Sequence, residues 1–147
     1  MRYFEDFAEG QVYELGEASI SEAEILEFAR KYDPQPFHVD QAAAQHSMFR
    51  GLIASGWQTA SMYMGLLVRG LLLDSASLGS AGVDELRWLK PVRPGDVLRG
   101  RVTITSVRPS SKSPSRGTVA TFGELFDRQG ERVYFVRSSG MFARRPR

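Results

Sequence analysis

The stretch ASGWQTASMYMGLLVRGLLL, residues 54–73, is the longest apolar segment of this 147-residue chain. Small residues (Gly56, Ala60 and Gly65) are interspersed with bulky ones, and apolar side chains would fall on nearly every side of a helix. The segment contains Arg69 and falls short of the ~18 uncharged apolar residues that mark a membrane span. It therefore predicts a buried central helix that must contact other protein on all sides.

The segments that follow this helix change to a strand pattern, rich in Val, Thr, Phe and Tyr and separated by the turn sequences RPGD, PSSKSPSRG and RQGE. The predicted strands cover residues 82–90, 96–107, 117–127 and 132–143, with an earlier one at 11–18. Short turns favour antiparallel pairing, so we expect the last four strands to form a meander. An antiparallel β-sheet wrapped around one central helix satisfies this order, which makes the class α+β. The other side of the helix must meet more protein, which suggests a homodimer.

Two short helices are expected before the central one. Ser21 and Glu24 have the spacing of a capping box, and the apolar residues that follow recur at helical spacing. These features predict a helix over about residues 22–31. Asp40 is expected to cap a second short helix over residues 41–48.

Asp33 and His38 lie on one proline-containing stretch, YDPQPFH, at residues 32–38. Pro34 and Pro36 end the preceding helix and should hold this stretch in an extended or turning conformation. A carboxylate and an imidazole on one stiff loop can hold a water molecule between them, with the acid as base and the imidazole as relay or acid. An acid before proline is also a common turn starter, so spacing alone leaves both interpretations open.

The entry to the central helix, FRGLIASGW at residues 49–57, offers a second feature. Backbone N–H groups at a helix N-terminus are unpaired donors at the positive end of the helix dipole. Because Gly56 has no side chain, a substrate carbonyl could approach its N–H closely, as in an oxyanion hole. Gly51 and Gly56 could equally serve only close packing of the chain.

Residues 28–60, FARKYDPQPFHVDQAAAQHSMFRGLIASGWQTA, resemble the MaoC-like dehydratase family, the hotdog-fold (R)-specific enoyl-CoA hydratases. Residues 82–102, GVDELRWLKPVRPGDVLRGRV, are also similar to the strand-and-turn pattern of that family. The resemblance extends over essentially the whole chain, and we expect one domain over residues 1–147. It implies a hotdog fold, usually paired into a dimer.

By this resemblance, Asp33 and His38 match the catalytic acid and histidine of the family. They would activate a water that adds across the double bond of a trans-2-enoyl thioester, or remove one in reverse. The backbone N–H of Gly56 matches the donor that stabilises the enolate oxygen. Gln35 stands where many hydratases have Asn, and Met64 stands where some members place a serine.

The thioester substrate, on CoA or on acyl carrier protein, is expected to contact residues of the loop and of the central helix. The candidate substrate-binding residues are Gln35, Ser55, Trp57, Ser61 and Met64. Either Ser61, one turn before Met64, replaces the missing serine, or no residue does. We expect the acyl chain to run along the helix past Trp57, Tyr63 and Met64.

Other properties narrow the function. The absence of cysteine excludes disulfides and thiolate chemistry and fits a cytoplasmic protein, and the start of the chain lacks the apolar region of a signal peptide. A net charge of +2 is too small to indicate a nucleic-acid partner.

His38 and His46 lack the spacing of a metal site, so we expect no metal and no cofactor, and we place His46 on the surface. The basic residues of 108–116 and 143–147 are either solvated or a weak anion-binding rim.

Two other functions stay open. A hotdog acyl-CoA thioesterase usually carries an acid on the central helix, and residues 54–73 contain no Asp or Glu. The chain could also be a non-catalytic subunit that binds acyl thioesters, an alternative that the departures at Gln35 and Met64 leave open.

Overall fold

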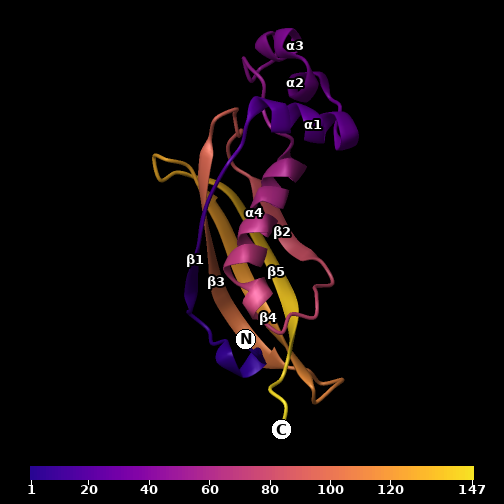
Figure 1. Cartoon of the computed structure of the whole chain (residues 1–147), viewed down its shortest axis with the longest axis vertical. Coiled ribbons are helices and arrows are strands. Elements are labelled where there is room, and N and C mark those ends of the chain that lie inside the picture. The colour runs from indigo at the N-terminus through magenta and orange to yellow at the C-terminus, as the bar shows by residue number, and fades with distance from the viewer.

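The computed structural model describes all residues 1–147, in which an antiparallel sheet of five strands carries one long helix across its face (Figure 1). The helices are α1 (Glu22–Tyr32), α2 (Pro36–Val39), α3 (Gln41–Gln45) and α4 (Gly56–Gly70), with single 3-10 turns at Phe4–Asp6 and Leu72–Asp74. The strands are β1 (Val12–Ser19), β2 (Val83–Trp88), β3 (Val97–Pro109), β4 (Arg116–Phe126) and β5 (Arg132–Ala143). The predicted α+β class and central helix are confirmed.

The sheet has the order β1-β3-β4-β5-β2, with every pair antiparallel. Strands β3, β4 and β5 form the predicted meander, but the prediction that β2 begins it is wrong, because β2 pairs with β5 at the far edge. The segment between β2 and β3, residues 89–96, crosses the end of the sheet instead of closing a hairpin. Its turn residues showed where the chain bends, and they carry no information on which strand becomes the neighbour.

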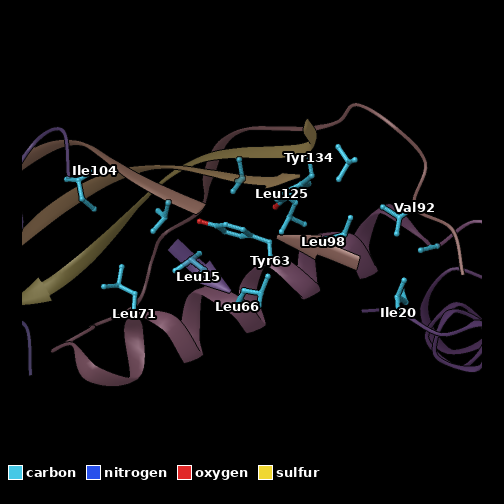
Figure 2. Packing of buried hydrophobic residues seen from close by; sticks show 14 of the residues in the cluster. Leu15, Ile20, Tyr63, Leu66, Leu71, Val92, Leu98, Ile104, Leu125 and Tyr134 are labelled. Carbon is cyan, nitrogen blue, oxygen red and sulfur yellow. The ribbon is translucent and has the colours of Figure 1, made fainter. Parts of the chain in front are cut away.

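One face of α4 packs on the sheet. Tyr63 and Leu66 are 3% exposed, and Figure 2 shows Tyr63 between α4 and the sheet, near Leu125 and Tyr134. The opposite face, which we call the outer face, is open in the single chain, because its Trp57 and Met64 are exposed. The all-round apolar pattern of α4 therefore divides into a sheet-facing half and an uncovered half. None of the helices, α4 included, has the length and hydropathy to cross a membrane.

The three short helices lie together at the end of the sheet where α4 begins (Figure 1). The capping box that starts α1 is formed, with Ser21 and Glu24 bonded to each other's backbone N–H groups at 3.1 and 3.0 Å. Asp40 caps α3 as predicted, although α3 ends at Gln45 and not at residue 48. Gln35 is extended, as expected for residues 32–38, whereas Pro36 is the first residue of the short helix α2, where its missing N–H costs no hydrogen bond.

Candidate active site

Asp33 ends α1 and turns its side chain toward the start of α4. Its N–H still donates to Ala29 O at 2.8 Å, but its backbone (φ −153°, ψ 67°) is no longer helical because Pro34 disfavours the helical region for the residue before it. Its side chain is 17% exposed. The carboxylate is thus mostly sheltered and yet reachable from one side.

His38 lies in α2 with a buried side chain whose Nδ1 is 2.7 Å from the carbonyl oxygen of Ile53. A carbonyl oxygen only accepts, so Nδ1 carries the hydrogen and the neutral ring leaves Nε2 as a bare acceptor. This Nε2 lies 3.3 Å from Oδ2 of Asp33. The acid and the imidazole predicted to act together are therefore in contact. His46, by contrast, is exposed as predicted and bonds to Ala42 O of its own helix.

Two side chains donate to the Asp33 carboxylate, one to each oxygen. Gln35 Nε2 donates to Oδ1 at 2.7 Å, and the Ser55 hydroxyl donates to Oδ2 at 2.8 Å. Burial alone raises the pKa of Asp33, but the bonds from Gln35 and Ser55, together with His38, outweigh it and hold this pKa below its ordinary value. Asp33 is therefore ionised at neutral pH and can accept a proton.

The start of α4 places a backbone donor next to this pair. Ser55 caps the helix, with its hydroxyl oxygen accepting from Trp57 N at 3.3 Å, and Gly56 is the first helical residue. The N–H of a first helical residue has no partner within its own helix, and that of Gly56 donates to no other group of the chain. An unpaired N–H at the positive end of the longest helix can stabilise a negatively charged oxygen.

The predicted site residues fall into two groups. Asp33, Gln35, His38 and Ser55 form one hydrogen-bonded cluster, and the Gly56 amide adjoins it. Trp57, Ser61 and Met64 lie instead on the outer face of α4, where they border an open hollow of about 640 Å³ together with Phe28 and Tyr32 of α1.

The role of this second group in substrate binding stays a prediction. The Ser61 hydroxyl donates to Trp57 O of its own helix at 2.8 Å. Tyr63 does not share the outer face with Trp57 and Met64, because it is buried against the sheet. The expectation that these three residues border one path along the helix is wrong for Tyr63.

Two groups of the site were missed from the sequence. The Ile53 carbonyl orients His38, and a backbone carbonyl has no sequence signal. Trp88, at the end of β2, donates from its indole Nε1 to Gly56 O at 2.8 Å. The chain has only two tryptophans, and their rings meet edge to face with centroids 5.1 Å apart, but nothing in the spacing of Trp57 and Trp88 indicates this contact.

Known proteins that are similar to this chain point to one family. Residues 6–121 match the family described as MaoC like domain. The (R)-specific enoyl-CoA hydratase of Rhodospirillum rubrum is 33% identical over 142 residues, which cover 95% of each chain. The crystal structure of a MaoC-like dehydratase from Rhodospirillum rubrum aligns over 100% of both chains with a TM-score of 0.92 and 40% identity.

A second solved structure, the (R)-hydratase of A. caviae, aligns over 95% of this chain and 98% of its own, with a TM-score of 0.68 and 27% identity. The family match extends over more than half of the chain, and these neighbours share its five-stranded sheet and central helix. The chain therefore belongs to the MaoC-like dehydratase family and has its hotdog fold.

Proposed function

We propose that this protein adds water to the double bond of a trans-2-enoyl thioester, or removes it from the corresponding 3-hydroxyacyl thioester. The observation that carries the proposal is the contact between Asp33 and His38 beside the unpaired N–H of Gly56. The relative named (R)-specific enoyl-CoA hydratase supports the reaction type.

The reaction requires three groups, and the cluster offers one for each. The Asp33 carboxylate takes a proton from water as the water oxygen bonds to C3 of the substrate. The electrons of the double bond move onto the thioester oxygen, where the Gly56 N–H donates to the developing charge. The proton passes to Nε2 of His38 and from there to C2, so that water is consumed and no other reactant is needed.

The fixed tautomer of His38 suits this role. Because Nδ1–H is held by Ile53 O, any proton that the ring gains is carried on Nε2, the atom that faces Asp33. The lowered pKa of Asp33 keeps the acceptor ionised before each turnover. No metal or cofactor takes part in the proposed step.

The thioester is the part of the substrate that must reach Gly56, and we place the acyl chain along the outer face of α4. Trp57 and Met64 offer exposed apolar surface there, next to the hollow shared with α1. Burial of an acyl chain on this surface gains about 0.8 kcal/mol per CH₂. We propose acyl-CoA as the substrate class, with acyl carrier protein thioesters as the alternative carrier.

We also propose that a second copy of the chain covers the outer face. Large exposed apolar side chains that gather in one place mark a binding surface in most soluble proteins. Tyr32 is 64% exposed and Trp57 59%, and they border the same hollow. A homodimer would shelter this surface and enclose the acyl chain.

The test compares two variants with a matched control. Asp33→Asn and His38→Ala should each lower the hydration of crotonyl-CoA by ~10²–10⁴-fold, the usual contribution of a general acid or base. The loss of enoyl absorbance measures the rate, and circular dichroism checks the fold. His46→Ala removes the other histidine, which lies on the surface, and should keep the activity of the unmodified protein. Near-normal hydration by either site variant would refute the assignment.

The same assay separates the alternative functions. Release of free thiol from acyl-CoA would indicate a thioesterase, although α4 contains no Asp or Glu to serve it. A raised melting temperature with acyl-CoA, but no turnover on short, long or branched enoyl-CoA, would indicate a non-catalytic binding subunit.

A further inference from the structure

The end of β2 and the segment that follows it hold the residues that start α4 at two points. Trp88 Nε1 donates to Gly56 O at 2.8 Å, and Ala54 N donates to Val92 O at 2.8 Å. The helix start therefore lies between these two bonds, one on each side of the amide proposed as the oxyanion donor.

This segment is itself anchored to the hairpin of β4 and β5. Leu89 N donates to Val133 O at 2.9 Å, and Lys90 Nζ lies 2.8 Å from Asp127 Oδ2. Trp88 is thus attached to the sheet through its own strand and through the two residues that follow it. A side chain held in this way can restrain the group that it contacts.

The contact with Trp88 also explains why residue 56 is glycine. A Cβ built at this position would lie 2.7 Å from Cδ2 and 2.8 Å from Nε1 of the Trp88 indole, closer than real Cβ atoms approach other heavy atoms. The indole occupies the place of a side chain at residue 56. Gly56 itself would be free to rotate about its backbone bonds, since it has no Cβ to restrict them.

We propose that Trp88 is a positioning residue that fixes the direction of the Gly56 N–H. The indole N–H of Trp88 holds the carbonyl oxygen of Gly56. The amide of Trp57, which belongs to the same peptide group, donates to the hydroxyl of Ser55. With the bond at Ala54 on the other side, the peptide that carries the Gly56 N–H has little freedom left. This inference rests on the proposed role of that N–H as oxyanion donor.

The kinetic test is Trp88→Phe, which keeps an aromatic ring and removes the N–H donor. We expect kcat for crotonyl-CoA to fall roughly tenfold, a part of the ~10²–10³-fold loss that follows complete removal of an oxyanion donor. KM should stay within about twofold, because the interaction acts in the transition state. Arg87→Gln, an exposed change on the same strand, is the control and should leave both constants unchanged. An unchanged kcat, or a change in KM alone, would overturn the proposal.

A second test measures the contact without an assay of activity. Gly56→Ala should lower the melting temperature by roughly 5 °C, since the new methyl overlaps the indole. Gly65→Ala on the same helix meets only the mobile end of Arg69 and should cause no loss. In a Trp88→Leu background, Gly56→Ala should lower the melting temperature much less, because the space that the indole fills is then open to the new methyl. Equal losses in both backgrounds would show that residues 56 and 88 are not coupled.

The two tests fail in different ways. If the unmodified protein does not hydrate any enoyl thioester, the proposed function is wrong, and the melting temperatures still decide whether Trp88 restrains Gly56. If hydration occurs and Trp88→Phe keeps the normal kcat, the function stands and the positioning role is wrong.

Discussion

The hydroxyl of Ser55 donates to Oδ2 of Asp33 at 2.8 Å, and this bond joins the first turn of α4 to the end of α1. The same hydroxyl oxygen accepts from Trp57 N, so one side chain both caps the helix and holds the carboxylate. Ser55 is 0% exposed, which shields the bond from competing water. The candidate acid and the Gly56 amide are thereby fixed relative to each other.

Ser55→Ala should move the acid limb of hydration to higher pH. Burial raises the pKa of Asp33, and the bonds from Gln35 and Ser55, with the nearby His38, lower it. Without the Ser55 donor the lowering is smaller, so the pKa of Asp33 rises. Because the ionised form accepts the proton, activity then disappears at a higher pH than in the unmodified protein. A profile of kcat/KM against pH, extended below ~4, the ordinary range of an aspartate, measures the shift.

Ser55→Ala should also destabilise the protein by about 0.5–2 kcal/mol, the cost of losing a helix N-cap. Ser106→Ala, an exposed change on β3, is the control for serine removal. It should alter neither the acid limb of the pH profile nor the free energy of unfolding. An acid limb that stays in place in Ser55→Ala would show that this hydroxyl does not tune Asp33.

Gln35→Leu tests the other oxygen of the same carboxylate. Gln35 Nε2 donates to Oδ1 of Asp33 at 2.7 Å, so an apolar side chain of similar size removes the donor and keeps the volume. The pKa of Asp33 should rise again and the acid limb should move to higher pH. Gln35 is exposed, and the free energy of unfolding should change by less than about 0.5 kcal/mol.

The matched control for this change is Gln41→Leu. Gln41 Nε2 also donates to a carboxylate, Glu22 at 2.6 Å, but this pair lies outside the candidate site. The pH profile of Gln41→Leu should coincide with that of the unmodified protein. If the profile of Gln35→Leu also coincided with that of the unmodified protein, Gln35 would have no role in lowering the pKa of Asp33.

Much of the fold followed from local patterns. The capping box of Ser21 and Glu24 placed the start of α1, and the change of period after residue 73 separated helix from sheet. The position of β2 did not follow, because its pairing with β5 depends on the path of residues 89–96 around the end of the sheet. Such a path is determined by tertiary packing, which a local sequence pattern does not show.

The site was predictable only where it is local in sequence. Asp33 and His38 are five positions apart on one proline-containing stretch, so their contact could be expected. The bond from Trp88 to Gly56 joins residues 32 positions apart, and the carbonyl that orients His38 belongs to a residue without a special side chain. Neither has a pattern that one sequence can show.

Tyr63 and Gly123 form a contact whose strength can be tested by unfolding. The Tyr63 hydroxyl is buried without a hydrogen-bond partner, and a Cβ at residue 123 would overlap it. Burial, with Tyr134 and Glu124 nearby, raises the pKa of Tyr63, so the hydroxyl stays neutral. Gly123→Ala should cost about 1–3 kcal/mol, the usual range for overpacking.

Tyr63→Phe removes this unpaired hydroxyl and should leave the stability unchanged or raise it by about 1 kcal/mol. Gly123→Ala should then cost somewhat less free energy of unfolding in the Tyr63→Phe background, because one of the overlapping atoms is gone while the ring carbons Cζ and Cε1 still overlap the new methyl. Urea unfolding of the two single variants and the double variant measures the coupling. Additive effects would contradict the contact.

Met64→Lys tests whether a second copy covers the outer face of α4. Met64 is 50% exposed in the single chain, so a lysine there can extend into water and should leave the folded monomer intact. In a dimer that buries this face, the two unpaired charges would oppose association, and light scattering at micromolar concentration should show a monomer where the unmodified protein is a dimer. Met48→Lys replaces a methionine that is 88% exposed and lies away from α4, and it should remain dimeric. A monomeric unmodified protein, or a Met64→Lys variant that still dimerises, would contradict a homodimer formed through this face.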